Sequence, residues 1–264
     1  MTTPSEPPPR AAAPHAATPH RVSAHLGVDA AAYDAAIRRF IPGYEEMIAE
    51  VVSILDESLD EAVRVVDLGA GTGALAGAIL DGVPRSRLVL VDIDPHMLEV
   101  AAARVAAHGE RAELRCATFD DALDSMAKAT TAARPAAAAA IDGDPGVGAV
   151  VACLALHHVA ELEHKRALYR RIYDALAPGG VFLCADCTVH ETGPEHARTF
   201  REWAAGMGRA GIPAAEAEAL FAKWAGEDRY YPLAVELDLL ASAGFARPEC
   251  FWKRGASTVF GAFR

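Results

Sequence analysis

The sequence has few cysteines and no long hydrophobic run. Only 5 of its 264 residues are cysteine. That number is small and odd, so we expect reduced thiols rather than a disulfide framework, and a cytoplasmic setting. No run of about 18 apolar residues occurs, which argues against a membrane-spanning helix. The first twenty residues lack a basic start followed by an apolar stretch, so we do not expect a secretory signal.

Basic residues are also scarce. The chain has 25 Lys and Arg against 36 Asp and Glu, for a net charge of −11. An acidic chain repels phosphate backbones unless it carries a local basic patch. No cluster of five or more Lys and Arg occurs. We therefore expect a small-molecule partner, and neither a nucleic acid nor a membrane lipid. The sequence leaves open whether the chain forms a homodimer.

The N-terminal part is predicted to contain a tail and a helical lid. Residues 1–22 are rich in Pro and Ala, and such a composition predicts a disordered tail. Residues 23–60 are predicted to form the lid. Apolar periodicity indicates helices over 29–41 and 43–58, and a Pro-Gly pair separates them.

From residue 61 onward the pattern alternates between apolar strands and helices. Continuous apolar strands separated by helices predict an α/β fold with a mostly parallel sheet covered on both faces. The last two strands alternate around a glycine, which indicates an antiparallel hairpin. We expect a loose loop insertion at 124–148 and a helical cap at 195–231. The expected strands are 64–68, 88–91, 112–116, 149–153, 180–185, 248–253 and 257–263; the other expected helices are 74–81, 95–107, 163–176 and 233–242.

The strongest chemical signal is the segment VVDLGAGTG at residues 65–73. A strand runs into a glycine-rich turn that opens a helix, and glycine lets the backbone approach a ligand closely. Asp92 ends the next strand about 20 residues later, where nucleotide-binding folds place a carboxylate on the ribose hydroxyls. This context predicts a nucleoside-containing cofactor.

Two cofactors fit the glycine pattern. The spacing Gly69-x-Gly71-x-x-Ala74 formally matches the dinucleotide fingerprint. However, the carboxylate of Asp67, two residues before the first glycine, would repel a pyrophosphate and suits a ligand with an ammonium and a sulfonium. The C-terminal hairpin also replaces the second nucleotide-binding half of a dinucleotide fold. We therefore expect S-adenosylmethionine rather than NAD.

Four motifs together resemble a known family. They are DLGAGTG, VDIDPHML at 91–98, LALHHV at 154–159 and LAPGG at 176–180. In this order, across 63–264, the sequence resembles the class I S-adenosylmethionine-dependent methyltransferases. The resemblance implies a Rossmann-like, seven-stranded sheet with a C-terminal antiparallel hairpin. It also implies methyltransferase activity with S-adenosyl-L-methionine as cofactor.

A narrower resemblance rests on IRRFIPGYEEM at 37–47, KRALYRRIYDALAPGGVFL at 165–183 and CFWKRGASTVFG at 250–261. These segments look like a subgroup that includes small-molecule methyltransferases and carboxy-S-adenosylmethionine synthase, a tRNA-modification enzyme. The resemblance implies that Tyr44 contacts the methionine end of the cofactor. Arg209 roughly matches an arginine with which the synthase holds its extra carboxylate, although the neighbouring residues match poorly.

The adenine contact departs from the family pattern. Many relatives carry Gly-Asp after the third strand, where this chain has Ala117-Thr118-Phe119-Asp120. Thr118 can accept a hydrogen bond and Phe119 can pack on adenine. Asp120 is an alternative after a one-residue shift, and both remain open. The expected cofactor contacts are Tyr44, Asp67, Gly69, Ala70, Gly71, Gly73, Asp92, Ile93, Thr118, Phe119 and Cys153.

Candidate catalytic residues follow the fourth and fifth strands. His157 and His158 come after the fourth strand, and Asp186 ends the fifth. A base is needed only if the acceptor must lose a proton, and a histidine here suits that role. The alternative is that these side chains cap helices or pack in the core. Cys184 and Cys187 would point to opposite faces of a strand, so we expect no metal site.

Three functions compete at this point. The first is methyl transfer to oxygen or nitrogen of a small organic molecule. The second is carboxy-S-adenosylmethionine synthesis, which would need a cation near the sulfonium. The third is a non-catalytic, cofactor-binding partner subunit, and the intact glycine turn argues against it.

Overall fold

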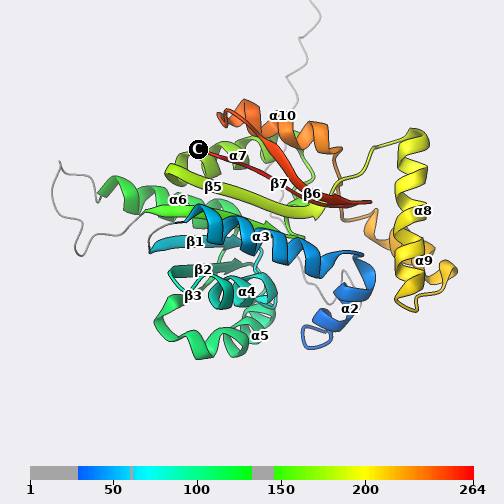
Figure 1. Cartoon of the computed structure of the whole chain (residues 1–264), viewed down its shortest axis with the longest axis horizontal. Helices are drawn as coiled ribbons and strands as arrows, with labels where there is room; N and C mark the ends of the chain where they lie inside the picture. The colour runs from blue at the N-terminus through cyan, green and yellow to red at the C-terminus, as the bar shows by residue number, and fades with distance from the viewer. Residues whose placement is uncertain (1–28, 60–61, 133–145) are drawn as a thin grey trace, which may run out of the picture.

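The computed structural model describes residues 29–59, 62–132 and 146–264, and only the backbone of 127–132. The predicted disordered tail at 1–22 therefore lies outside the described residues. Figure 1 shows a central sheet with helices on both sides. The α/β class predicted from the strand and helix alternation is confirmed.

Seven strands form one sheet in the order β3-β2-β1-β4-β5-β7-β6. β1 to β5 run parallel, and β7 pairs antiparallel with both β5 and β6. The predicted C-terminal hairpin is confirmed. The sheet order reverses between β1 and β4, and open α/β sheets bind ligands at such a switch point. The strands are β1 Val63–Leu68, β2 Ser86–Asp92, β3 Ala112–Cys116, β4 Val147–Cys153, β5 Leu176–Cys187, β6 Glu249–Arg254 and β7 Ser257–Phe263.

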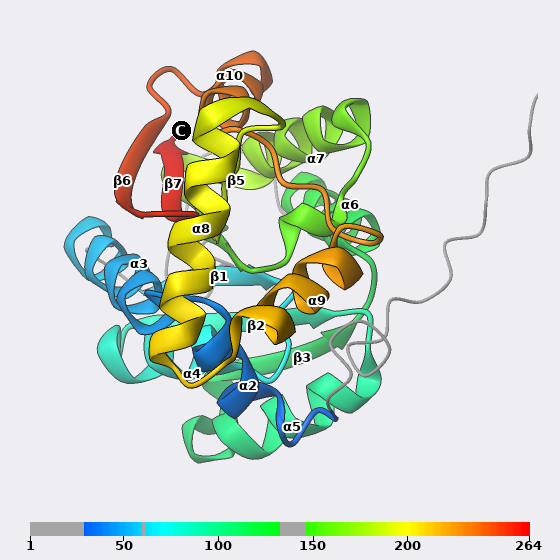
Figure 2. The same ribbon diagram turned by 90° about the vertical axis from the view of Figure 1, so that its right-hand side faces the viewer.

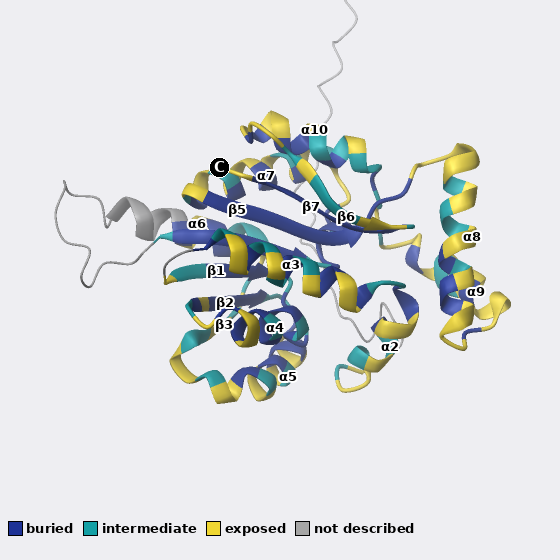
Figure 3. Cartoon of the chain, viewed as in Figure 1, coloured by how far each residue is buried: buried dark blue, intermediate teal, exposed yellow. Residues whose placement is uncertain are grey.

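Helices bury both faces of the sheet. One face packs against α3, α4 and α5, and the other against α6, α7 and α10, so two cores result. The central strands are buried along most of their length, as Figure 3 shows, because alternate side chains enter one core or the other. These helices are α3 Tyr44–Ser58, α4 Ala74–Gly82, α5 Pro95–Val105, α6 Phe119–Ala132, α7 Leu162–Ala175 and α10 Leu233–Ala243. Within the described ranges, no helix combines the length and apolar character that crossing a membrane requires.

Three further helices lie beyond the carboxyl ends of the strands. α2 (Tyr33–Phe40) precedes α3, and α8 (Gly193–Arg209) and α9 (Ala214–Trp224) follow β5. Figure 2 shows α8 and α9 crossing this end of the molecule, near α2. The Trp203 indole donates a 2.7 Å hydrogen bond to the carbonyl of Phe40, and Phe40 contacts the Trp224 ring. The lid region and the cap region are therefore packed against each other.

Several predicted boundaries were wrong. The loop was expected to begin at residue 124, but α6 continues to Ala132. The loop was expected to end at residue 148, but β4 already starts at Val147. Residues 133–145 lie outside the described residues. The first lid helix begins at Tyr33 rather than 29. The fifth strand, expected at 180–185, spans Leu176–Cys187 as β5, with a register shift where β4 pairs with its start.

Candidate functional site

A cavity of about 660 Å³ opens where the carboxyl ends of β1, β2 and β4 meet. This volume lies within the range of roughly 300–1,000 Å³ that is typical of small-molecule sites. Its walls come from the glycine turn after β1, the ends of β2 and β4, the lid helix α2, and the loop after α9. Segments that are far apart in sequence thus contribute to a single site.

The glycine turn shapes one wall. Gly69 has a φ of +78°, and a Cβ on it would lie 2.4 Å from the Cβ of Ala155 after β4. Both Gly69 and Ala70 donate their backbone N–H to the carbonyl of Val91. Only glycine fits a left-handed backbone this close to a neighbouring strand end. The turn is therefore held open toward the cavity by β2 and β4.

Asp67 is a buried carboxylate on the cavity wall with no hydrogen-bond partner in the described part of the chain. Its exposed fraction is 0%. Burial, together with the nearby Asp92 carboxylate, raises the pKa of Asp67 to about 7. A buried, unpaired carboxylate is costly unless a donor or a cation meets it. The expected S-adenosylmethionine carries an ammonium, and Asp67 fits such a group.

Asp92 is preorganised by backbone donors. Its two carboxylate oxygens accept hydrogen bonds from the N–H groups of Gly71 and Asp94, each at 2.8 Å. Burial raises the pKa of Asp92, while these bonds oppose the rise. Each oxygen keeps acceptor capacity toward the cavity. The side chain is thus fixed where it can accept bonds from a diol such as a ribose.

The lid helices bring two tyrosines to the cavity, of which Tyr44 is buried and Tyr33 is partly buried. Gly43 has a φ of +86°, and its missing side chain leaves room for the Trp252 ring, so the chain turns sharply into Tyr44. Tyr44 and Tyr33 both line the cavity. The Asp34 carboxylate accepts a 2.6 Å bond from the hydroxyl of Thr72 in the glycine turn and also pairs with Arg104. The lid is therefore linked directly to the turn that it covers.

The segment after β3 supplies another part of the wall. Thr118, Phe119 and Asp120 all line the cavity. The Thr118 hydroxyl donates to Asp121 and accepts the backbone N–H of the same residue, which is a helix-capping arrangement. Asp120 pairs with His164 at 2.9 Å. Both predicted alternatives for the adenine contact are present, and each already has a local partner.

His157 is held in place by Asp186. Its Nδ1 atom lies 2.7 Å from Oδ1 of Asp186, whose other oxygen accepts the N–H groups of Leu156 and His157. Burial alone would lower the pKa of the His157 imidazole, but the adjacent Asp186 carboxylate has the larger effect, so the pKa of His157 is raised. The same pairing lowers the pKa of Asp186 despite its burial. Leu154, just before this segment, has a strained φ of +50°. His157 lines the cavity and Asp186 lies behind it.

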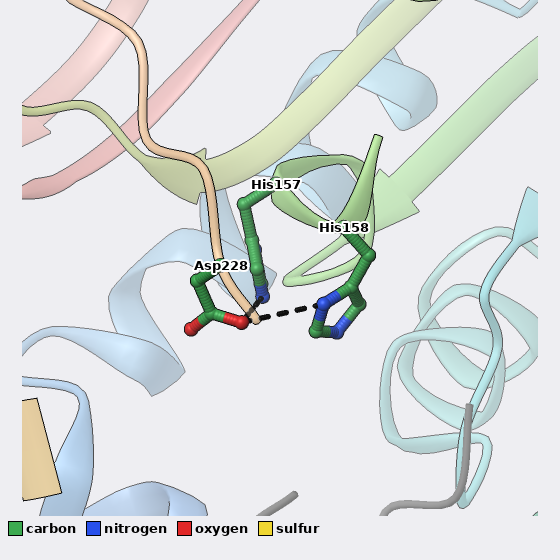
Figure 4. Close-up of side chains that lie close together, drawn as sticks. All are labelled: His157, His158 and Asp228. Atoms are coloured by element: carbon green, nitrogen blue, oxygen red, sulfur yellow. Dashed lines mark ion pairs between the residues drawn. The ribbon is translucent and has the colours of Figure 1, made fainter. Parts of the chain in front are cut away.

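A second carboxylate faces the two histidines from another loop. Asp228 follows α9, and its Oδ1 lies 3.3 Å from Nδ1 of His158 and 3.8 Å from Nε2 of His157. The Tyr230 hydroxyl donates a 2.5 Å bond to Oδ2 of Asp228. Figure 4 shows the three side chains pointing toward one another. This end of the cavity is therefore polar and rich in groups that bind or move protons.

Most of the residues predicted from sequence share this cavity. Gly73 immediately precedes α4 and packs against Ala101 of α5, and it does not line the cavity. Asp186 lies behind His157 and does not line the cavity either. Cys187 reaches the cavity while Cys184 enters the opposite core, as the strand alternation predicted. The predicted residues on the wall are Tyr44, Asp67, Gly69, Ala70, Gly71, Asp92, Ile93, Thr118, Phe119, Cys153, His157 and His158.

Sequence reasoning missed Asp228, Asp34 and Tyr33. Asp228 lies in the loop between α9 and α10, where a polar residue is ordinary, so no local signal marks it. Asp34 is in the first turn of a helix, where an acidic residue is also common. Of the aromatic residues in the cap, Trp224 and Tyr230 line the cavity, whereas Trp203 belongs to the core.

Comparison with known proteins points to methyltransferases. A family model described as a methyltransferase domain matches residues 66–182. Carboxy-S-adenosyl-L-methionine synthase of Chromohalobacter salexigens is 27% identical over 159 residues, which cover 60% of this chain and 53% of that protein. The chain thus spans about half the length of this curated relative.

Solved structures share the fold at low identity. An O-methyltransferase family 2 protein from Planctomyces limnophilus, in complex with apigenin, is 17% identical with a TM-score of 0.54, over 82% of this chain and 57% of that one. PigF, solved with SAH, is 18% identical with a TM-score of 0.50, over 83% and 56% of the two chains. The seven-stranded architecture is therefore shared with proteins of this kind.

Proposed function

Because the chain belongs to the class I S-adenosylmethionine-dependent methyltransferases, we propose that it methylates an oxygen or nitrogen of a small organic molecule. One observation carries the proposal. A single cavity contains both the Asp67 and Asp92 carboxylates at the glycine turn and the His157 imidazole after β4. A cofactor site and a proton-accepting group thus share one enclosed space.

Residues at the glycine turn, at the end of β2 and on the lid would hold the cofactor. Asp67 would meet its ammonium, Asp92 its ribose hydroxyls, and Tyr44 its methionine end. When bound, S-adenosylmethionine supplies an electrophilic methyl, to which an acceptor lone pair bonds as the carbon–sulfur bond breaks and its electrons pass to sulfur. The lid helices and the cap aromatics would exclude water from this space.

His157 would receive the proton of the acceptor. Asp186 bonds Nδ1 of His157, so the imidazole keeps its lone pair on Nε2, which points toward Asp228 and the cavity. The carboxylate also stabilises the imidazolium that forms. A hydroxyl or an ammonium that must shed a proton before attack would gain most from this arrangement.

The charge of the cavity favours methyl transfer over carboxy-S-adenosylmethionine synthesis. Among the described residues that line it there is no Lys and no Arg, whereas seven carry carboxylates. Arg209, the candidate for holding an extra carboxylate, is exposed on α8 and does not line the cavity. A neutral or cationic acceptor suits such walls, and an anionic ligand would be repelled. The same repulsion, with a net charge of −11, disfavours a nucleic-acid acceptor.

The decisive experiment uses S-adenosylmethionine labelled on its methyl group, with a panel of small hydroxylated and amine compounds. We expect label in an organic product, and a loss of about 100-fold or more in rate for His157→Ala, since general bases contribute roughly 10²–10⁴. Calorimetry should show that this variant still binds the cofactor. Cofactor binding without transfer to any acceptor would indicate a non-catalytic subunit. Mass spectrometry that finds carboxy-S-adenosylmethionine on the purified protein would favour the synthase.

A further inference from the structure

Three potential metal-ligand atoms converge at the acceptor end of the cavity. His157 and His158 lie on the short helix η2 (Leu156–His158), directly after β4, and Asp228 comes from the loop after α9. Nε2 of His157, Nδ1 of His158 and a carboxylate oxygen of Asp228 all lie within 4.8 Å of one another. All three residues line the cavity, and Figure 4 shows their ring nitrogens and the carboxylate facing a common point.

The separations from Asp228 are close to those between neighbouring ligands of one ion. Metal–nitrogen and metal–oxygen bonds of about 2.0–2.2 Å place neighbouring ligands roughly 3.0–3.5 Å apart. The observed separations from Asp228 are 3.3 Å to His158 and 3.8 Å to His157. The second distance is beyond an ordinary hydrogen bond and needs only a small side-chain rotation to fit.

Two of the three proposed ligands have the supporting hydrogen bonds that are usual in metal sites. A metal-bound histidine usually donates its other ring N–H to a carboxylate, and a ligating carboxylate is itself hydrogen-bonded. Asp186 accepts from Nδ1 of His157 at 2.7 Å, which leaves the lone pair on Nε2. Tyr230 donates to the outer oxygen of Asp228. A metal ion between Nε2 of His157 and the inner oxygen of Asp228 would be attracted to both atoms.

We propose that His157, His158 and Asp228 bind one divalent first-row transition-metal ion, with its open positions facing the cavity. Two imidazoles and one carboxylate suit Zn²⁺ or Fe²⁺ rather than Mg²⁺ or Ca²⁺, which prefer oxygen ligands. The inference rests on the proposed function and changes one step of it. An acceptor hydroxyl that coordinates the ion becomes acidic, its O–H bond breaks toward a solvent base, and the electron pair stays on oxygen. His157 is then a ligand and not the base.

The test uses Co²⁺ as a spectroscopic probe on the chain without a polyhistidine tag, after removal of bound metal with a chelator. We expect one Co²⁺ per chain with a visible absorption band. His158→Ala and Asp228→Asn should weaken binding at least 10-fold, and Asp186→Asn about 10- to 100-fold through its effect on His157. His164→Ala is the matched control, since His164 also lines the cavity and pairs with Asp120. It should bind Co²⁺ as the wild type does.

The outcomes separate this inference from the proposed function. Calorimetry with S-adenosylmethionine should give wild-type affinity for His158→Ala, which shows that the variant is folded. Co²⁺ binding that is absent, or equal in all the variants, would overturn the metal site. Full methyl transfer by the chelator-treated chain would also overturn it while leaving the proposed function intact. Cofactor binding without methyl transfer, with and without metal, would overturn the proposed function instead.

Discussion

The carboxylate of Asp186 at the end of β5 holds the imidazole of His157, which lies on the short helix η2 after β4. One oxygen lies 2.7 Å from Nδ1 of His157, and the other accepts the backbone N–H of the same residue at 3.1 Å. Asp186 is 4% exposed, so water does not compete for these bonds. Two neighbouring parallel strands thus fix both the position and the tautomer of one histidine.

We therefore expect Asp186→Asn to lower the rate of methyl transfer about 10- to 100-fold, because partners that orient a functional histidine carry effects of that size. The amide can donate to Nδ1, which would move the imidazole proton to Nε2. The affinity for S-adenosylmethionine, measured by calorimetry, should stay within twofold of the wild type. An unchanged rate, or an equal loss of cofactor affinity, would contradict a positioning role.

Asp67 should destabilise the free protein. Its pKa of about 7 is above the ordinary value of 3.8, so between these values the folded chain retains a proton that the unfolded chain releases. The free energy of unfolding then falls as the pH rises through this window. We predict that Asp67→Asn raises the free energy of unfolding by about 1–3 kcal/mol at pH 8, because it removes an unpaired buried charge.

Urea unfolding at pH 5 and pH 8 checks this prediction, with a larger gain at pH 8. The same variant should bind S-adenosylmethionine at least 10-fold more weakly, since the amide cannot neutralise an ammonium. A variant that is less stable than the wild type at pH 8 would show that Asp67 has a stabilising partner in the free chain.

The sheet and the glycine turn could be predicted because their signals are local. Parallel strands covered on both faces read as continuous apolar runs, and the turn from Gly69 to Gly73 needs glycines at fixed spacing. The end of α6 could not be predicted, since its Ala- and Thr-rich sequence up to Ala132 has little apolar contrast and resembles a loop.

Contacts between distant segments were the other limit. Asp228 approaches His157 only because the cap helices α8 and α9 bring the chain back across the ends of the strands. No spacing pattern in the sequence predicts this contact. Asp34 likewise reaches Thr72 through the packing of the lid. Most of the predicted cofactor residues lie at the end of a strand of the parallel sheet or directly after it. Because the carboxyl ends of parallel strands lie at one edge, the topology alone predicted that these residues would lie close together.

Asp92 offers a direct test of the cofactor site. Asp92→Asn keeps the shape of the side chain but removes its charge and replaces one acceptor with a donor. We expect the dissociation constant for S-adenosylmethionine to rise at least 10-fold, since a hydrogen bond to a charged group contributes about 1.5–3 kcal/mol. Glu99→Gln, an exposed carboxylate on the nearby helix α5, is the control and should not change the affinity. Equal affinity for wild type and Asp92→Asn would contradict the ribose assignment.

The link between Asp34 and Thr72 predicts that the lid closes over the cofactor. Asp34 joins α2 both to the glycine turn and to Arg104 on α5, while Tyr33 and Tyr44 line the cavity from the lid side. A bound cofactor would add contacts on that side, so hydrogen exchange across residues 33–58 should slow when S-adenosylmethionine binds.

In Asp34→Ala the exchange of α2 should be faster, and the cofactor should dissociate several-fold faster. Glu57→Ala is the control, because Glu57 is exposed at the far end of α3 and accepts a bond from Ser53 of the same helix. Exchange that is unchanged by the cofactor would rule out a lid, whatever the effect of the substitutions.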